Sequence, residues 1–460
     1  MNRQQGDDWR CYPEVEKFID ETLSQFMADW PFIRALQQNL LLKTSTRLQD
    51  WIDHLVFTAS DDLIRRLRNF GFQLENVPAS AAQQIYHHPK AIFPPIILEK
   101  SNNTSPSHLS GIALITENIT LFLNAIGVST EIEGSPLSLY RRAVLSEQGD
   151  RKLWAVERRG YRGFVPQELA GDFADQLLRG YERWMTRTRK YEDKLAGMDH
   201  TLKLAENLAD MLGEDLAAWT AFKAERDYWM MRNRAGRVQF MRQNSLGLGW
   251  ANHDHHTFRC SREAFPKLLQ TLRVFGFQPR EKFYAGSEAG WGAQVLEQPA
   301  CRLVVFADVD LSAEELSLDF EKVSLPVRKE KGTVGFWCSL HGESLLEAGL
   351  HHLAALFSFP DLQRDLEKER ILLLPAFSHF PYLKQAFTIG ERWKPDKNKL
   401  TSLFRQNLID SLQMESYSWE GIIGSHLENI QRSEGFKGFN QQSVSDIIRR
   451  TDPRLDFGAA

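Results

Sequence analysis

Cysteine is scarce in this chain of 460 residues: the four that occur, Cys11, Cys260, Cys301 and Cys338, are scattered. Without a Cys-x-x-Cys pair, neither a disulfide framework nor a structural zinc site is expected, and a reducing cytoplasm fits best. No apolar run approaches the ~20 residues that cross a bilayer, and MNRQQGDDWR at the start lacks the apolar core of a secretion signal. The sequence predicts a cytoplasmic protein without a membrane partner.

Positive charge is also not in excess. The net charge of -4 disfavours a nucleic-acid partner, because binding to a duplex requires a concentrated positive face. The motifs G-x-x-x-x-G-K-[ST], G-x-G-x-x-G, H-E-x-x-H and G-x-S-x-G are all missing. What remains is an ordinary globular composition, with 42% hydrophobic and 25% charged residues.

An internal repeat is the most informative feature that is present. Residues 53–73 read DHLVFTASDDLIRRLRNFGFQ, and residues 254–278 read DHHTFRCSREAFPKLLQTLRVFGFQ. Each copy predicts a buried strand, an amphipathic helix and a second strand. Gly71 and Gly276 stand where the end of a helix favours a left-handed residue.

The two copies divide the chain into three predicted parts. Residues 1–171 would form an N-terminal module with a helix at its start, and residues 244–460 a C-terminal module with inserted helices. The charged stretch 172–243 lacks Gly, Ser and Pro runs, so it is interpreted as a helical connector. Within the C-terminal part, a strand is expected over 333–338 and helices around 345–357 and 400–412.

Several segments resemble one known family. The second copy, with Asp254-His255-His256-Thr257-Phe258-Arg259 and then Phe283-Tyr284-Ala285-Gly286, is similar to the first βαβ unit of the 2-oxoadipate dioxygenase/decarboxylase (hydroxyglutarate synthase) family. That family belongs to the vicinal-oxygen-chelate superfamily. The end of the chain, from Gly435-Phe436-Lys437-Gly438-Phe439 through Ser443, Asp446, Thr451 and Asp452, also resembles it, as does Ile132-Glu133-Gly134-Ser135-Pro136. The implied fold is α+β, with duplicated βαβββ-type curved mixed sheets and added helices.

The resemblance also implies a chemistry: Fe(II)-dependent oxidation and decarboxylation of a 2-oxo acid. Two histidines and one carboxylate typically hold such an iron. His255 stands where the family places its first metal histidine, and Glu428 is the implied carboxylate. Arg259 lies four residues after His255, so on a strand both face one side, and a guanidinium there can bind the carboxylate of a substrate.

The second histidine of the family pattern falls near Val334, where this sequence has none. His341 is the candidate that replaces it, with His426 as another. In the first copy His54 is kept, but Ile112 stands where the second histidine is expected, so that copy is predicted to hold no metal.

Two other functions use the same scaffold. A metal-free relative would bind a ligand or a partner protein, and a glyoxalase-like isomerase would use another metal. The oligomeric state stays open.

Overall fold

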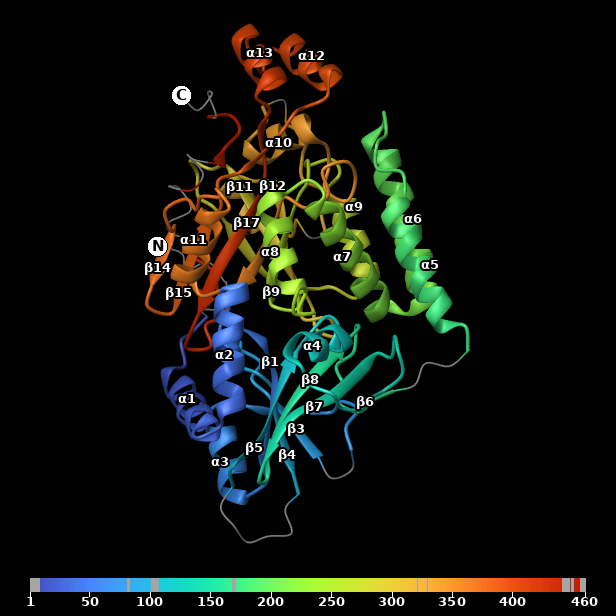
Figure 1. Cartoon of the computed structure of the whole chain (residues 1–460). Coiled ribbons are helices and arrows are strands. Elements are labelled where there is room, and N and C mark those ends of the chain that lie inside the picture. The colour runs from blue at the N-terminus through green and yellow to red at the C-terminus, as the bar shows by residue number, and fades with distance from the viewer. Residues whose placement is uncertain are drawn as a thin grey trace.

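The computed structural model describes residues 9–80, 83–100, 107–167, 171–320, 322–328, 330–440, 447 and 451–455. It contains two mixed β-sheets, one below the other in Figure 1, with helices packed around them. The predicted α+β class is confirmed. All four cysteines are free. Among the described residues, every helix falls short of the length and hydrophobicity that crossing a membrane requires.

The first sheet has eight strands in the order β2-β3-β4-β1-β5-β8-β7-β6. It contains two βαβββ units that meet where β1 and β5 pair antiparallel, and within each unit the first strand is parallel to the last. The elements are β1 (Ile52–Thr58), α3 (Asp61–Asn69), β2 (Gln73–Glu75), β3 (Gln83–His87), β4 (Ile96–Glu99), β5 (Leu109–Ile115), α4 (Ile119–Ile126), β6 (Ile132–Glu133), β7 (Tyr140–Gln148) and β8 (Arg151–Arg158).

The second sheet repeats this topology in the order β10-β11-β12-β9-β13-β17-β15-β14, with β16 paired to β17. Its two units meet where β9 and β13 pair antiparallel. The elements are β9 (His253–Arg259), α9 (Phe265–Val274), β10 (Gln278–Tyr284), β11 (Trp291–Gln298), β12 (Leu303–Asp310), β13 (His352–Leu356), α11 (Phe359–Lys368), β14 (Ser378–Phe380), β15 (Leu383–Phe387), β16 (Glu391–Trp393) and β17 (Ile422–Arg432). The internal repeat therefore marks the first unit of each sheet.

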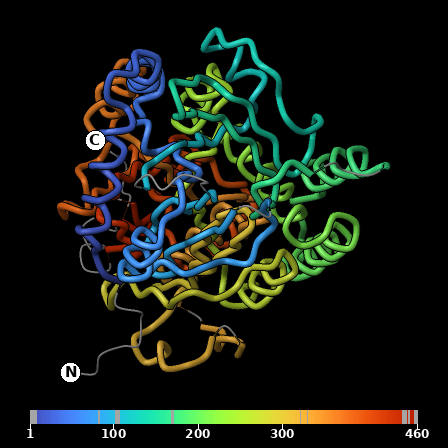
Figure 2. Tube along the Cα trace, turned by 90° about the horizontal axis from the view of Figure 1, so that it is seen from below, coloured from blue at the N-terminus to red at the C-terminus, as the bar shows by residue number. Residues whose placement is uncertain are grey.

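The remaining helices flank or connect the sheets. In Figures 1 and 2, α1 and α2 lie on one flank of the molecule, and α5 and α6 lie on the other. The bounds are α1 (Pro13–Met27), α2 (Pro31–Thr44), α5 (Phe173–Thr186), α6 (Lys194–Leu212), α7 (Glu214–Met230), α8 (Arg234–Asn244), α10 (Thr333–His341), α12 (Lys397–Arg405), α13 (Ser411–Trp419) and the short 3₁₀ helices Leu48–Trp51 and Glu314–Ser317. The stretch between the sheets is helical, as the sequence predicts, and the division at residues 171 and 243 stays a prediction.

Local patterning explains the repeated helices. In α3, the Ser60 side chain caps the first turn, and Leu63 and Leu67 are buried. Gly71 and Gly276 follow α3 and α9 with φ of 91° and 74°, a conformation that other residues rarely adopt. Both predicted helix ends are therefore confirmed.

One face of the second sheet is covered by helices and the other carries polar side chains. Leu268 of α9 and Phe222 of α7 belong to the same core cluster as Val305 and Leu353 of the strands. Successive strand residues point to opposite faces. The opposite face, which we call the inner face, therefore carries His255, Arg259, Phe306, Asp308 and Glu428.

The strand predicted over 333–338 is wrong, because these residues form α10. The cause lies far away in the sequence: the Asp310 carboxylate accepts hydrogen bonds from the backbone N–H groups of Gly332, Val334 and Gly335. A carboxylate at the start of a helix satisfies N–H groups that have no partner within the helix. Thr333-Val334 is strand-like in composition, but this distant cap favours the helix.

The helix predicted around 345–357 is also wrong. The segment contains turns, with positive φ at Leu345 and Gly349, followed by strand β13. Strand β13 pairs with β9 on one side and with β17 on the other, and four of its five residues are buried. Such a central strand has no alternation of polar and apolar residues, which explains the error. Around 400–412, the single predicted helix is two, α12 and α13.

Candidate metal centre

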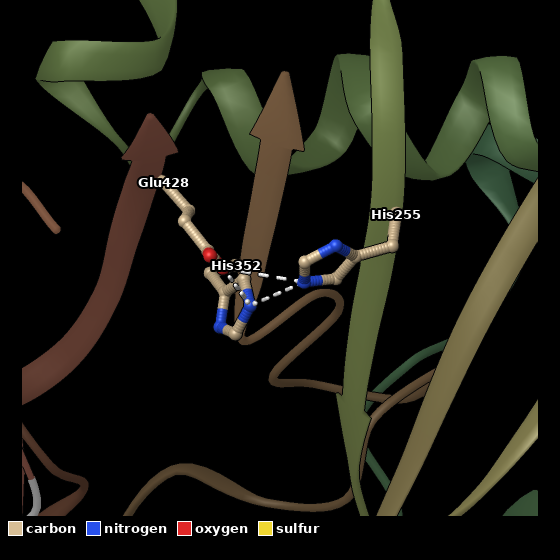
Figure 3. Close-up of side chains that lie close together, drawn as sticks. All are labelled: His255, His352 and Glu428. Carbon is tan, nitrogen blue, oxygen red and sulfur yellow. Dashed lines mark hydrogen bonds and ion pairs between the residues drawn. The ribbon is translucent and has the colours of Figure 1, made fainter. Parts of the chain in front are cut away.

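Three side chains of the metal-ligand type meet on the inner face (Figure 3). Nε2 of His255 lies 3.2 Å from Oε2 of Glu428 and 3.3 Å from Nε2 of His352. Nε2 of His352 lies 3.1 Å from the same carboxylate oxygen. All three residues are buried. Two imidazole nitrogens and one carboxylate oxygen form the ligand set typical of a 2-His-1-carboxylate metal site.

Three neighbouring strands position this group. His255 lies on β9, His352 on β13 and Glu428 on β17, and β13 is the central strand of the three. Ala354 of β13 is the register partner of both His255 and Glu428, and His352 lies two residues earlier on the same face. The register of the sheet therefore brings the three side chains together.

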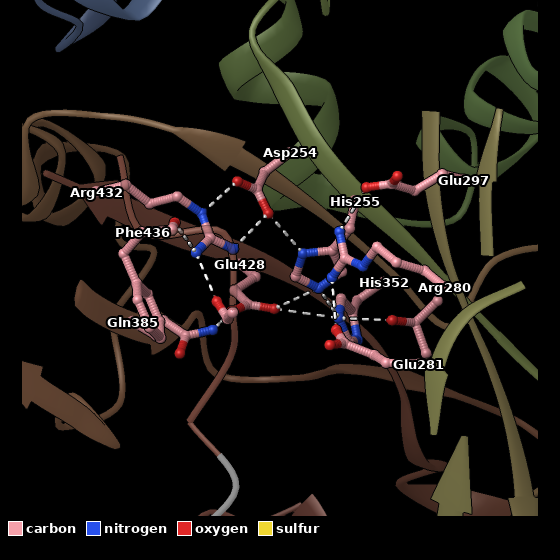
Figure 4. A network of polar contacts seen from close by, with 12 residues as sticks. Asp254, His255, Arg280, Glu281, Glu297, His352, Gln385, Glu428, Arg432 and Phe436 are labelled. Atoms are coloured by element: carbon pink, nitrogen blue, oxygen red, sulfur yellow. Dashed lines mark hydrogen bonds and ion pairs between the residues drawn. The ribbon is translucent and has the colours of Figure 1, made fainter. Parts of the chain in front are cut away.

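Further hydrogen bonds orient two of the ligand candidates (Figure 4). Nδ1 of His255 lies 2.9 Å from Oδ1 of Asp254, and Arg432 donates to both Asp254 oxygens over 2.7 and 3.1 Å. With its hydrogen on Nδ1, His255 presents an unprotonated Nε2 to a metal. Gln385 donates to Oε1 of Glu428 over 2.8 Å, which leaves Oε2 for the metal.

His352 is held differently. Its Nε2 lies 2.9 Å from Oγ1 of Thr257, and its Nδ1 has no hydrogen-bond partner among the described residues. Aromatic rings close the surroundings: Phe306 and Phe439 lie 4.9 and 5.1 Å from the ring of His255, and Phe387 lies 5.1 Å from that of His352. Three phenylalanine rings therefore border the two imidazoles.

The charges within the group are strongly coupled in the metal-free state. Burial disfavours the charged form of His255, but Glu428 and Asp254 outweigh it and raise the pKa of His255 to about 9. Burial would raise the pKa of Glu428, yet His255 and His352 lower it to about 2. For His352, burial dominates and lowers the pKa to about 4. Without a metal, a proton on His255 therefore balances the charge of Glu428.

The residues present fit a divalent metal ion. The three donor atoms already face one another within 4.8 Å, and they belong to buried side chains with a net negative charge once His255 is deprotonated. A buried carboxylate beside two imidazoles is costly unless a cation compensates it. A metal ion at this point would supply that charge and would replace the proton on His255.

We expect metal binding to release about one proton per chain at pH 7, because His255 is protonated below a pKa of about 9 and a ligand must be deprotonated. The apparent affinity then rises roughly tenfold per pH unit up to about pH 9 and levels off above it. Titration calorimetry with Zn²⁺ in buffers of different ionisation enthalpy measures this proton. A heat that is independent of the buffer would contradict it.

The raised pKa of His255 has the opposite effect on the stability of the metal-free chain, which falls as the pH rises. The folded-state pKa of His255 is raised, so its ion pair contributes stability fully below the unfolded pKa of 6.5 and loses it as pH rises through about 9. Metal affinity and metal-free stability therefore change in opposite directions with pH.

The structure brings together two of the three residues that the sequence singles out as ligands, His255 and Glu428. The third, His341, lies on α10, where its Nε2 donates to the backbone carbonyl of Ile423 over 3.1 Å and its ring packs between Trp337 and Trp393. It is outside the group in Figure 3. Ser443 and Asp446, which carry part of the family resemblance, lie outside the described residues.

Arg259 lies on the inner face of β9, four residues after His255, as the spacing predicts. It is buried, with its Nε 3.7 Å from Oδ2 of Asp308 and its guanidinium carbon 5.6 Å from the ring of Trp337. Nε and Nη1 of Arg259 and Oδ1 of Asp308 have no hydrogen-bond partner among the described residues. Arg259 therefore forms a loose ion pair with Asp308 and has donors without a hydrogen-bond partner, on the same face as the metal ligands.

Sequence reasoning missed His352 because it assigned residues 345–357 to a helix. A second internal repeat, which the sequence analysis did not use, contains the signal. Residues 158–164 read RRGYRGF, and residues 432–439 read RSEGFKGF. Aligning them equates Arg158 at the end of β8 with Arg432 at the end of β17. The strand β13, which lies parallel to β17, therefore corresponds to β5, which lies parallel to β8.

The contacts within the two repeats match closely. Arg158 donates to both oxygens of Asp53 over 2.8 Å, and Asp53 lies 2.6 Å from Nδ1 of His54. The ring of Phe164 lies 4.9 Å from that of His54, where Phe439 lies against His255 in the second sheet. The first sheet therefore keeps the arrangement that orients one histidine.

The ligand positions themselves differ between the sheets. In the second sheet, Ala354 is the register partner of His255 and of the carboxylate ligand candidate on β17. In the first sheet, Ala113 of β5 is the register partner of His54 and of Trp154 on β8. Trp154 therefore stands at the position of the carboxylate.

Gly111, two residues before that alanine, stands at the position of His352. The prediction that Ile112 occupies this ligand position is wrong by one residue. Because neighbouring residues of a strand point to opposite faces, Ile112 points away from the ligand position. The ring of Trp154 covers Gly111, where a Cβ would come within 2.0 Å of it. Trp154 fills the volume that the ligand side chains occupy in the second sheet.

Comparison with protein-family models and with curated proteins found no match. Among solved structures, a variant of 4-hydroxymandelate synthase from Streptomyces coelicolor is 12% identical, covers 88% of this chain and 98% of its own, and has a TM-score of 0.27. A putative hydrolase from Shewanella frigidimarina is 14% identical over 48% of this chain and 96% of its own, with a TM-score of 0.34. A glyoxalase I variant from Zea mays is 14% identical over 25% of this chain and 45% of its own, with a TM-score of 0.19. At these identities and TM-scores the comparisons do not indicate a function, which has to be inferred from the site itself.

Proposed function

We propose that the chain is an Fe(II)-dependent dioxygenase that decarboxylates a 2-oxo acid, with His255, His352 and Glu428 as the metal ligands. The observation that carries the proposal is the convergence of these three buried donor atoms on the inner face of one sheet. Two histidines and one carboxylate with open positions are the arrangement that non-haem Fe(II) oxygenases use. When bound, the metal would supply the site for a chelating 2-oxo acid and for O₂.

Arg259 is the proposed anchor for a carboxylate of the substrate. It keeps its charge even when buried, because the guanidinium does not lose its proton in proteins. Its Nε and Nη1 have no hydrogen-bond partner among the described residues, and a buried donor without such a partner is costly. A substrate carboxylate would accept a charge-assisted hydrogen bond from one of these donors.

The protein would contribute orientation and exclusion of water. Asp254 and Gln385 keep the donor atoms of His255 and Glu428 directed at the metal. Phe306, Phe387 and Phe439 surround the imidazoles, so reacting groups would be shielded from water.

The test is purification without oxygen, followed by metal analysis and measurement of oxygen uptake with a panel of 2-oxo acids. We expect about one iron ion per chain, uptake that depends on both iron and the 2-oxo acid, and CO₂ released with it. The Arg259→Met variant should retain iron but raise KM for the acid by about 10- to 100-fold, because one charge-assisted contact is lost. A folded protein that binds Fe(II) but consumes no oxygen with any acid would refute the proposal, and isomerase activity in its place would favour the glyoxalase-like alternative.

A further inference from the structure

A further histidine of the inner face, His426, is not among the three ligand candidates that converge there. His426 lies on β17 two residues before Glu428, so it points to the same face, and it pairs in register with His352 of β13. It is completely buried. Its ring is stacked on Phe387 at 5.0 Å and lies 5.6 Å from the ring of His351.

The hydrogen bonds of His426 define what it can bind. Its Nδ1 lies 3.0 Å from the backbone carbonyl of Thr388, and because a carbonyl only accepts, Nδ1 carries the hydrogen. In the neutral imidazole, Nε2 is then a hydrogen-bond acceptor. This buried Nε2 has no hydrogen-bond partner among the described residues. An unpaired buried acceptor is unfavourable, and the described residues provide no donor for it.

The fold does not require a histidine at this position. In the second sheet, His426 is the register partner of His352. In the first sheet, Gly111 stands at the position of His352, and its register partner on β8 is Lys152. Lys152 therefore corresponds to His426. Lys152 is in an ion pair with Glu147, and both side chains are about half exposed. The same strand position is thus exposed and charged in one sheet but buried and unpaired beside the metal ligands in the other.

His426 and Arg259 are connected by one aromatic wall. The guanidinium carbon of Arg259 lies 5.6 Å from the ring of Trp337, and that ring lies 5.3 Å from His351, which in turn contacts His426. Donors of Arg259 and an acceptor of His426, all without a hydrogen-bond partner among the described residues, thus belong to the same face of the sheet. A molecule that binds both residues must have a carboxylate oxygen to accept from Arg259 and a separate N–H or O–H group to donate to His426.

We propose that Nε2 of His426 accepts a hydrogen bond from the substrate, so that the substrate is a 2-oxo acid that also has a hydroxyl group. This rests on the proposed function and narrows its substrate class. His426 would then determine specificity, because an acid without the hydroxyl leaves the buried Nε2 unpaired. A site that hydrogen-bonds a substrate hydroxyl rejects the analogue that lacks it.

The experiment compares pairs of 2-oxo acids that differ only by a hydroxyl, namely 2-oxopentanoate with 5-hydroxy-2-oxopentanoate and phenylpyruvate with its 4-hydroxy derivative. Dissociation constants are measured without oxygen, from the absorption change when each acid binds the Fe(II)-loaded protein. For at least one pair we expect the wild-type protein to bind the hydroxylated acid about 5- to 100-fold more tightly, which corresponds to about 1–3 kcal/mol.

In His426→Phe, which keeps an aromatic ring but removes the acceptor, this ratio should fall to about one, whereas His426→Gln, which keeps an acceptor oxygen, should retain part of it. Iron content is the control for folding and for the metal site. A wild-type ratio near one for every pair, or a ratio that His426→Phe leaves unchanged, would overturn the inference while the proposed function stands. If no 2-oxo acid binds to the iron-loaded wild-type protein, the proposed function fails, and the inference fails with it.

Discussion

Replacing His352 by alanine is expected to reduce iron binding from about one ion per chain to almost none and to abolish oxygen uptake. The reason is that His352 supplies one of three donor atoms, and its Nε2 lies within 3.3 Å of His255 and 3.1 Å of Glu428. Loss of a group that only orients a ligand costs about 10- to 100-fold in metal affinity, so loss of a ligand should cost more. Metal analysis after dialysis and equilibrium titration with Fe(II) measure the effect.

The first sheet offers a matched control. His54 is also buried and also hydrogen-bonded to a carboxylate, 2.6 Å from Asp53, but Trp154 stands at the strand position that Glu428 has in the second sheet. His54→Ala should lower stability without changing the iron content. A second control, His341→Gln, keeps a side-chain donor for Ile423 and tests the alternative ligand directly. Retention of iron in His352→Ala, together with its loss in His341→Gln, would show that the site is not the one in Figure 3.

Changing Asp254 to asparagine should weaken metal binding by about 10- to 100-fold, the second-largest effect that we expect. Asp254 is ionised, because Arg432 and His255 lower its pKa, and it accepts the Nδ1 hydrogen of His255 over 2.9 Å. An amide is a weaker acceptor and introduces N–H donors opposite Arg432. Nδ1 of His255 would then be less firmly protonated, and the tautomer with hydrogen on Nε2, which cannot bind a metal through Nε2, would be populated.

The Asp53→Asn variant is the control, since Asp53 makes the same contacts with His54 and Arg158 and in addition pairs with Arg302 over 2.9 Å. It should destabilise the fold at least as much while metal affinity stays at the wild-type value. Affinity and unfolding are measured on both variants, by metal titration and by denaturant. An equal loss of metal affinity in the two would mean that Asp254 acts through overall stability and not through His255.

The sequence by itself determined the repeated framework. The Asp-His strand, the amphipathic helix and the FGFQ segment occur twice, and they correspond to β1 with α3 and to β9 with α9. Helical periodicity and the glycines at the helix ends are local properties, so they can be recognised without the fold. The family resemblance also pointed to His255 and Glu428, which the structure brings together.

Only the tertiary structure decided which residue accompanies them. His352 belongs to a central strand with partners on both sides, and such a strand has no alternating pattern in the sequence. Residues 333–341 form helix α10, which Asp310 caps from another strand, so His341 ends a helix and does not follow a strand of the sheet. In the first sheet, Trp154 covers Gly111 because β5 and β8 are neighbours. Each of these outcomes depends on pairing between segments far apart in the chain, and local patterns do not encode such pairing.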